Sequence, residues 1–118
     1  MIETWAEISH TEKKAVALKR FDSGHFLLSQ NDVWVSHMHG SWASETFVTT
    51  ERLESGMKVI KNMDGARNGQ NDHAEIMLSL DGKPNENTGR VVGAALCWSG
   101  NYKFRIDTDS NSGDDIFA

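Results

Sequence analysis

The chain has 118 residues, enough for one domain with a substantial core, and 38% of them are hydrophobic while 25% are charged. The formal net charge is −5 with the acidic residues scattered, so the clustered basic surface that nucleic-acid binding requires is missing. No stretch is long and apolar enough for a membrane span, and the first residues do not have a secretory-signal pattern, which leaves cytoplasm and periplasm both open. The single cysteine, Cys97, excludes an internal disulfide and is expected to be a small buried residue.

Short apolar stretches separated by turn residues predict β-strands along most of the chain. The stretch over residues 15–21 would also suit a helix, and the stretch over residues 73–80 is ambiguous by propensity alone, although its apolar residues alternate. A Gly- and Asn-rich loop is expected over residues 64–72. In chain order, the strands are expected over residues 4–8, 15–21, 26–28, 32–39, 45–53, 57–63 and 73–80.

The stretch Thr88–Asp109 is the clearest folding signal in the sequence. Val91–Trp98 is an almost unbroken apolar run, as expected of a strand that is covered on both faces. Ser99–Asn101 contains residues that tolerate positive φ, and Tyr102–Asp107 then alternates strictly between apolar and charged side chains. We therefore expect a β-hairpin at the centre of a sheet.

Roughly eight or nine strands at spacings of about 8–12 residues predict an all-β fold, an antiparallel β-sandwich, as a single domain over residues 1–118. After a polar, turn-like loop over residues 110–115, Ile116–Ala118 begins another apolar segment at the last residues of the sequence. We therefore expect a trimmed domain with further strands downstream.

Two patterns in the sequence suggest metal ligands, but neither is complete. His37-x-His39 places two imidazoles on one face of a strand, without a third His or Cys at a recognisable spacing. Asp107-x-Asp109-x-Asn111 resembles the start of a calcium loop but lacks the glycine and the glutamate at their required positions. No metal and no cofactor are therefore expected, and the second pattern is better interpreted as a solvated turn.

The sequence contains no complete catalytic apparatus. Asp72 and His73, beside Glu75, offer an acid–base pair, but neighbouring residues of a strand point to opposite faces and cannot address one substrate atom. No nucleophile elbow, phosphate loop or cysteine pair is present.

Tryptophan rings are the other candidates, because sugars stack their C–H faces on indoles. Trp98 is expected to be buried by its apolar neighbours. Trp42 is flanked by small residues, which favour an open ring, and Trp34 is a further candidate.

Four motifs follow one another along the chain. They are Gly40-Ser41-Trp42-Ala43-Ser44-Glu45, then Leu53-x-x-Gly56, then the Gly65-Ala66 loop, and then Gly89-Arg90-Val91-x-Gly93-x-x-Leu96-x-Trp98-Ser99-Gly100-Asn101-Tyr102. In this order they resemble the N-terminal domain of bacterial α-galactosidases of the melibiase and raffinose-cleaving kind, and the sequences of Bacteroidetes enzymes most of all. The resemblance covers residues 32–109 best.

The resemblance implies that the sandwich is part of a β-supersandwich that precedes a (β/α)8 barrel, in enzymes that are often homo-oligomers. It further implies a retaining reaction on terminal α-galactosides, whose two catalytic Asp residues lie in the barrel. Loops of the sandwich would border the galactose pocket, which makes Trp42, Asp72 and His73 candidates for its rim. Ser44 stands where the family has an arginine, and the loop over residues 67–73 differs from the family pattern.

The sequence thus predicts a non-catalytic domain that supports the barrel, shapes the rim of the active site and helps to build the oligomer. A free-standing sugar-binding module that uses Trp42 or Trp34 is the alternative. A structural β domain with only protein contacts is a third possibility.

Overall fold

A computed structural model describes residues 1–67, 71–109 and 113–117 and contains two four-stranded antiparallel sheets. The first sheet has the order β1–β8–β7–β4, formed by His25–Leu28 (β1), Gly113–Phe117 (β8), Tyr102–Asp109 (β7) and Gly56–Asn62 (β4). The second has the order β3–β2–β5–β6, formed by Ser44–Arg52 (β3), Trp34–Ser41 (β2), Asp72–Ser79 (β5) and Val91–Ala95 (β6).

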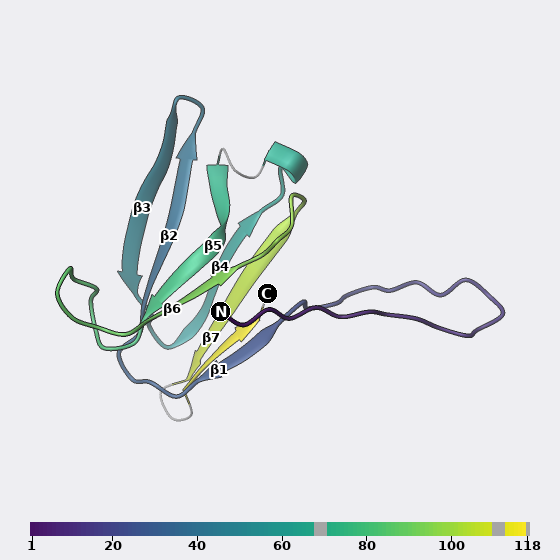
Figure 1. The fold of residues 1–118 in the computed structure, drawn as a ribbon, viewed down its shortest axis with the longest axis horizontal. Helices are drawn as coiled ribbons and strands as arrows, with labels where there is room; N and C mark the ends of the chain where they lie inside the picture. The colour runs from purple at the N-terminus through teal and green to yellow at the C-terminus, as the bar shows by residue number, and fades with distance from the viewer. Residues whose placement is uncertain (68–70, 110–112, 118) are drawn as a thin grey trace.

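The two sheets form the layers of a sandwich (Figure 1), so the predicted all-β antiparallel fold is confirmed. A short 3₁₀ helix, Gly65–Arg67, lies between β4 and β5. In the described part of the chain, no helix has the length and apolar character needed to cross a membrane.

The core lies between the inward faces of the two sheets. The alternation predicted for β7 is confirmed, because Tyr102, Phe104 and Ile106 are buried while Lys103 is exposed. Val35, on β2, contributes the corresponding apolar row of the second sheet. The buried hydrophobic residues are Val33, Val35, Ile60, Ile76, Leu78, Tyr102, Phe104 and Ile106.

The expected hairpin of β6 and β7 is wrong, because the two strands belong to different sheets. β6 pairs with β5, from Val91 opposite Ser79 to Ala95 opposite Glu75. β7 instead pairs with β4 and β8, so the central hairpin of the first sheet is formed by β7 and β8. The glycine turn after Trp98 therefore carries the chain from one sheet to the other.

The apolar run after Thr88 is also less buried than expected, since β6 is an edge strand with one neighbour. Val91 keeps 54% of its surface exposed, and Trp98 keeps 65%. Cys97 is exposed as well, which corrects the expectation of a core residue. Gly100 lies directly against the Trp98 indole, where a Cβ would come within 2.4 Å of the ring nitrogen.

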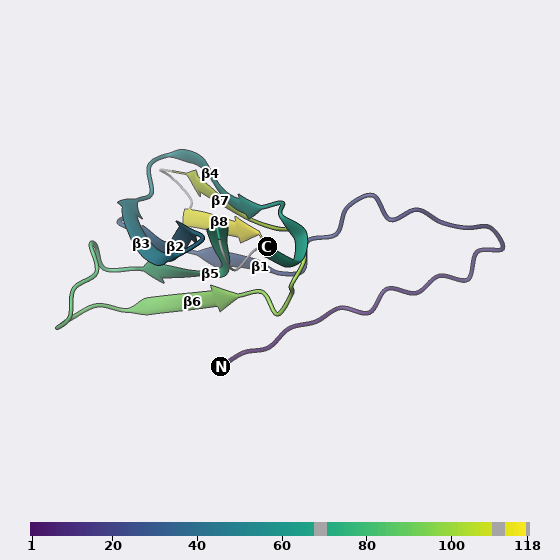
Figure 2. The ribbon, with the colours of Figure 1, turned by 90° about the horizontal axis from the view of Figure 1, so that it is seen from above.

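Residues 1–24 form an extended arm that projects from the body, and no strand is assigned to it (Figures 1 and 2). The strands expected over residues 4–8 and 15–21 are therefore wrong, and Trp5 is 86% exposed. Strand propensity alone does not order a segment that has no sheet edge to pair with.

The strand expected to begin at Ile116 is confirmed, although β8 begins three residues earlier, at Gly113, inside the stretch expected to be a loop. It pairs with both β1 and β7 and so lies inside its sheet. Ala118 and residues 110–112 lie outside the described residues.

Candidate functional site

The tip of the β2–β3 hairpin presents Trp42 to solvent with 81% of its surface exposed. The open ring that its small neighbours favoured is therefore present. The backbone beside it is unusual, because Ala43 has φ 61° and Thr46 has φ 65°, the left-handed region that L-residues rarely adopt. Backbone of this kind persists only where the surrounding contacts hold it in place.

Two such contacts are visible at the tip. Gly40 packs so closely on the returning strand that a Cβ there would lie 2.5 Å from the Ser44 carbonyl oxygen and 2.7 Å from Cα of Glu45. The backbone N–H of Ala43 donates a hydrogen bond of 3.0 Å to Oε1 of Glu45. The motif that begins at Gly40 thus builds a constrained tip that holds an aromatic ring out in water.

Asp72 is the first residue of β5, and its Cα is paired with that of His39 across a register shift between β2 and β5. Its charge acts on groups of the sandwich interior. Burial lowers the pKa of the His37 imidazole below its ordinary 6.5, and the Asp72 carboxylate partly offsets this. Burial also raises the pKa of Tyr102 to about 12, and the Asp72 charge adds to this effect.

His73 belongs with Glu75 rather than with Asp72. Nδ1 of His73 lies 3.6 Å from Oε1 of Glu75, two residues further along the same strand. Since alternate residues of a strand share a face, this contact places His73 on the face opposite Asp72. The structure therefore brings Asp72 and His73 together along the chain but not around one substrate atom, as the alternation of β5 predicts.

The imidazole rings of His37 and His39 lie on the same face of β2 with centroids 5.7 Å apart. Nε2 of His39 is 2.6 Å from Oγ1 of Thr49, which occupies one of its nitrogens. Among residues 1–67, 71–109 and 113–117, no group of three or more His, Cys, Asp or Glu side chains is arranged to hold a metal ion.

The calcium-like pattern starts within a strand rather than within a turn. Asp107 and Asp109 belong to β7, and Asp107 forms an ion pair of 2.7 Å with Arg105. Asn111, the third residue of the pattern, lies outside the described residues.

The hairpin tip, the start of β5 and the 3₁₀ helix lie at the same end of the molecule (Figure 1). Asn101, which follows the Ser99-Gly100 turn, holds the loop that contains the 3₁₀ helix. The N–H of Gly65 donates a 2.8 Å hydrogen bond to Oδ1 of Asn101. Oδ1 of Asn62 accepts a 2.8 Å hydrogen bond from the N–H of Asp64 in the same loop. Sequence reasoning missed these contacts, for which the only signal was the Asn-rich composition of the loop.

Two surface hollows of the described chain lie away from this end. One is formed by the loop over residues 81–89, and another lies between residues 30–33, 52–55 and 108–109. Neither is lined by Trp42, Asp72 or His73. Trp42 is exposed, whereas Asp72 and His73 are half-buried.

Residues 1–115 match the family model described as the glycosyl hydrolase family 36 N-terminal domain. The chain belongs to this family. This chain is 29% identical over 103 residues to "Alpha-galactosidase Mel36A" of Lactobacillus acidophilus, and the match covers 87% of the chain and 14% of that protein. It is also 29% identical over 72 residues to "Alpha-galactosidase 2" of Pediococcus pentosaceus, covering 61% of the chain and 10% of that protein.

The fold of this chain is similar to part of the crystal structure of the GH36 α-galactosidase AgaA from Geobacillus stearothermophilus. The TM-score is 0.73 at 20% sequence identity, and the match covers 83% of this chain and 13% of that one. The chain thus spans only about one seventh of these proteins or less. These matches do not support the expected likeness to Bacteroidetes enzymes in particular.

Proposed function

We propose that this domain is the non-catalytic N-terminal part of an α-galactosidase that removes terminal α-galactosyl residues. The family match and the printed names of the relatives support this proposal. In the parent protein the 118-residue sandwich supports the catalytic barrel of the same chain, contributes to the rim of the active site and takes part in a homo-oligomer. As a single sandwich domain, residues 1–118 are one piece of a much longer protein, in keeping with the coverage of 14%.

The single observation that carries the rim assignment is the constrained presentation of Trp42. A galactose ring has an apolar C–H face that stacks on an indole, and the stacking costs little entropy when the ring is already held in place. Asp72 starts β5 at the same end of the molecule and offers a hydrogen-bond acceptor for sugar hydroxyls. His73, on the opposite face of β5 from Asp72, is the third residue proposed for the rim.

The rim residues alone do not supply catalysis. A retaining glycosidase needs two carboxyl groups about 5–5.5 Å apart on either side of the scissile bond. Asp72 acts on the sandwich interior and Glu75 pairs with His73, so they do not flank a common site. The isolated chain should therefore show no turnover of a nitrophenyl α-galactoside above background, and measurable turnover would reject the non-catalytic assignment.

The rim assignment is tested in the full-length protein by Trp42→Ala. Loss of the stacking surface should raise KM for raffinose by roughly tenfold with a smaller change in kcat, since the ring contacts substrate rather than the reacting atoms. Trp5→Ala removes an equally exposed indole from the arm and serves as the matched control. Equal kinetic constants for Trp42→Ala and the wild type would place the ring outside the rim.

A free-standing sugar-binding module is the second candidate, and the same exposed indole favours it. Titration of the isolated chain with galactose or raffinose, followed by tryptophan fluorescence, separates the two functions. Millimolar binding that disappears in Trp42→Ala supports the module. An unchanged signal up to high millimolar sugar supports the role as part of a larger enzyme.

A further inference from the structure

The β2–β3 hairpin has a β-bulge directly beside its tip. The register between the two strands shifts between His39 and Ser41. As a result, Glu45 and Thr46 on β3 stand together opposite Gly40 on β2. A bulge of this kind bends its strand and changes the direction of a side chain, and bulges are frequent beside active sites. Here the bulge redirects the side chain of Glu45.

Two contacts hold the backbone of Glu45 in place. Gly40 packs directly against it, since a Cβ at Gly40 would lie 2.7 Å from the Glu45 Cα. The Thr46 hydroxyl donates a 2.7 Å hydrogen bond to the Glu45 carbonyl oxygen. From this position the Glu45 side chain turns back along the chain, where its Oε1 accepts the 3.0 Å hydrogen bond from the N–H of Ala43.

This hydrogen bond acts on the peptide unit that follows Trp42. Ala43 has φ 61°, a conformation that an L-residue adopts only at a cost and keeps only where its surroundings hold it. An ionised carboxylate is a stronger acceptor for the N–H than a neutral oxygen. Because the peptide unit is planar, fixing the N–H of Ala43 also fixes the backbone from which the indole of Trp42 projects.

We propose that Glu45 is a positioning residue, which holds the Trp42 indole in the orientation on which a galactoside stacks. This inference rests on the proposed function, because it concerns the same part of the rim. Glu45 acts through Trp42 and does not itself bind the sugar. Stacking on a ring that is already held in place loses less conformational entropy, so the expected effect of Glu45 is on substrate binding.

A double-mutant cycle in the full-length protein separates action through Trp42 from a direct contact with the sugar. Glu45→Ala should raise KM for raffinose roughly fivefold with a smaller change in kcat, since the ring remains but is no longer held. In the Trp42→Ala background, the same substitution should have no further effect. Glu45→Gln keeps an oxygen that accepts the N–H of Ala43, so its KM should stay within about twofold of the wild type.

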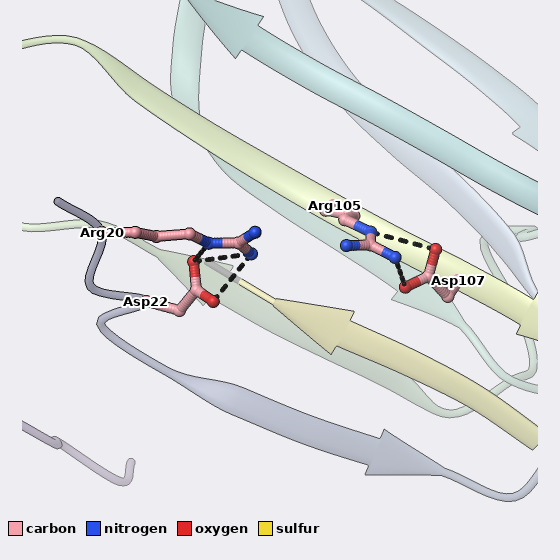
Figure 3. Close-up of polar contacts among 4 residues, drawn as sticks. All are labelled: Arg20, Asp22, Arg105 and Asp107. Carbon is pink, nitrogen blue, oxygen red and sulfur yellow. Dashed lines mark hydrogen bonds and ion pairs between the residues drawn. The ribbon is translucent and has the colours of Figure 1, made fainter.

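Asp107→Ala is the matched control. Like Glu45, Asp107 uses its carboxylate to bind the residue two positions earlier, since Nε of Arg105 donates a 3.1 Å hydrogen bond to its Oδ1. This pair lies on β7 of the other sheet, beside the ion pair of Arg20 and Asp22 (Figure 3). The kinetic constants of Asp107→Ala should equal those of the wild type.

A probe on the indole tests the positioning separately from the kinetics. Fluorotryptophan in place of Trp42 alone gives one fluorine resonance, whose position and width report the surroundings and the motion of the ring. The wild type and Glu45→Gln should give the same resonance, whereas Glu45→Ala should give a shifted and narrower one. Glu45 is exposed, so the melting temperatures of its variants should stay close to that of the wild type.

Three results would each overturn the inference. They are an unchanged fluorine resonance in Glu45→Ala, a Glu45→Gln variant that is as impaired as Glu45→Ala, and an effect of Glu45→Ala on KM that persists without the indole. The last result would assign Glu45 to a direct contact with the sugar. An unchanged KM for Trp42→Ala would instead reject the rim assignment, and the fluorine resonance then decides alone whether Glu45 positions the ring.

Discussion

Replacing Tyr102 by Phe removes a buried hydroxyl that has no hydrogen-bond partner among the described residues. The side chain is 6% exposed, and its ring packs edge to face on Phe104 with centroids 5.8 Å apart. The substitution keeps this ring contact. Since an unsatisfied buried polar group costs about 1–3 kcal/mol, we expect Tyr102→Phe to stabilise the fold by about 1 kcal/mol at pH 7.

The same hydroxyl gives the fold an alkaline limit. Burial raises the pKa of Tyr102 from 10 to about 12. The stability that depends on the neutral phenol is therefore fully present below pH 10 and is lost as the pH rises through 12. The difference between the two pKa values corresponds to about 3 kcal/mol in the free energy of unfolding, and Tyr102→Phe should not show this loss.

Two measurements check the reasoning. Tyr102 is the only tyrosine of the chain, so phenolate absorbance reports its pKa without interference from another tyrosine. Urea unfolding of the wild type and Tyr102→Phe at pH 7 and pH 11 then gives the two free energies of unfolding. A phenol that titrates near pH 10, or a variant that is less stable than the wild type at pH 7, would refute the account of a buried hydroxyl without a partner.

The remaining predictions concern the packing of the hairpin tip and the stability of the fold at acidic pH. Gly40→Ala should destabilise the fold by about 2 kcal/mol in urea unfolding and alter the tip, because its Cβ would lie 2.5 Å from the Ser44 carbonyl oxygen, and an unchanged stability would contradict the close packing. The lowered pKa of His37 means that its contribution to stability is present above pH 6.5 and is lost as the pH falls below that value. Melting temperatures between pH 7 and pH 5 should therefore fall less steeply for His37→Gln than for the wild type, whereas His10→Gln in the exposed arm should leave the slope unchanged.

Local patterns in the sequence predict the strands of the sandwich but not their partners. The alternation around Phe104 identifies both the strand and its buried face, because neighbouring residues along a strand alternate between its two faces. Val91 belongs to an equally clear apolar run, yet its strand lies at an edge, since pairing with β5 or with β7 depends on contacts far apart in sequence. The strands predicted within the arm do not form, because the segment around Trp5 has a strand-like sequence but no sheet edge to pair with.

The sequence likewise predicts some features of the candidate site and not others. The small neighbours of Trp42 predict an open ring, and the alternation of β5 predicts that Asp72 and His73 diverge. The sequence does not predict that Asp72 acts on His37 and Tyr102, which lie on other strands. Nor does it predict the hydrogen bond between residues 65 and 101, which are 36 positions apart.

The exposure of Cys97 has a practical consequence for solution work on this domain. In air, two copies can be cross-linked by a disulfide through their single thiols, which would produce a covalent species of dimeric mass. Mass measurements therefore need a reductant or a Cys97→Ser background. The same thiol is also a unique attachment point for a fluorescent label, placed where the chain passes between the two sheets.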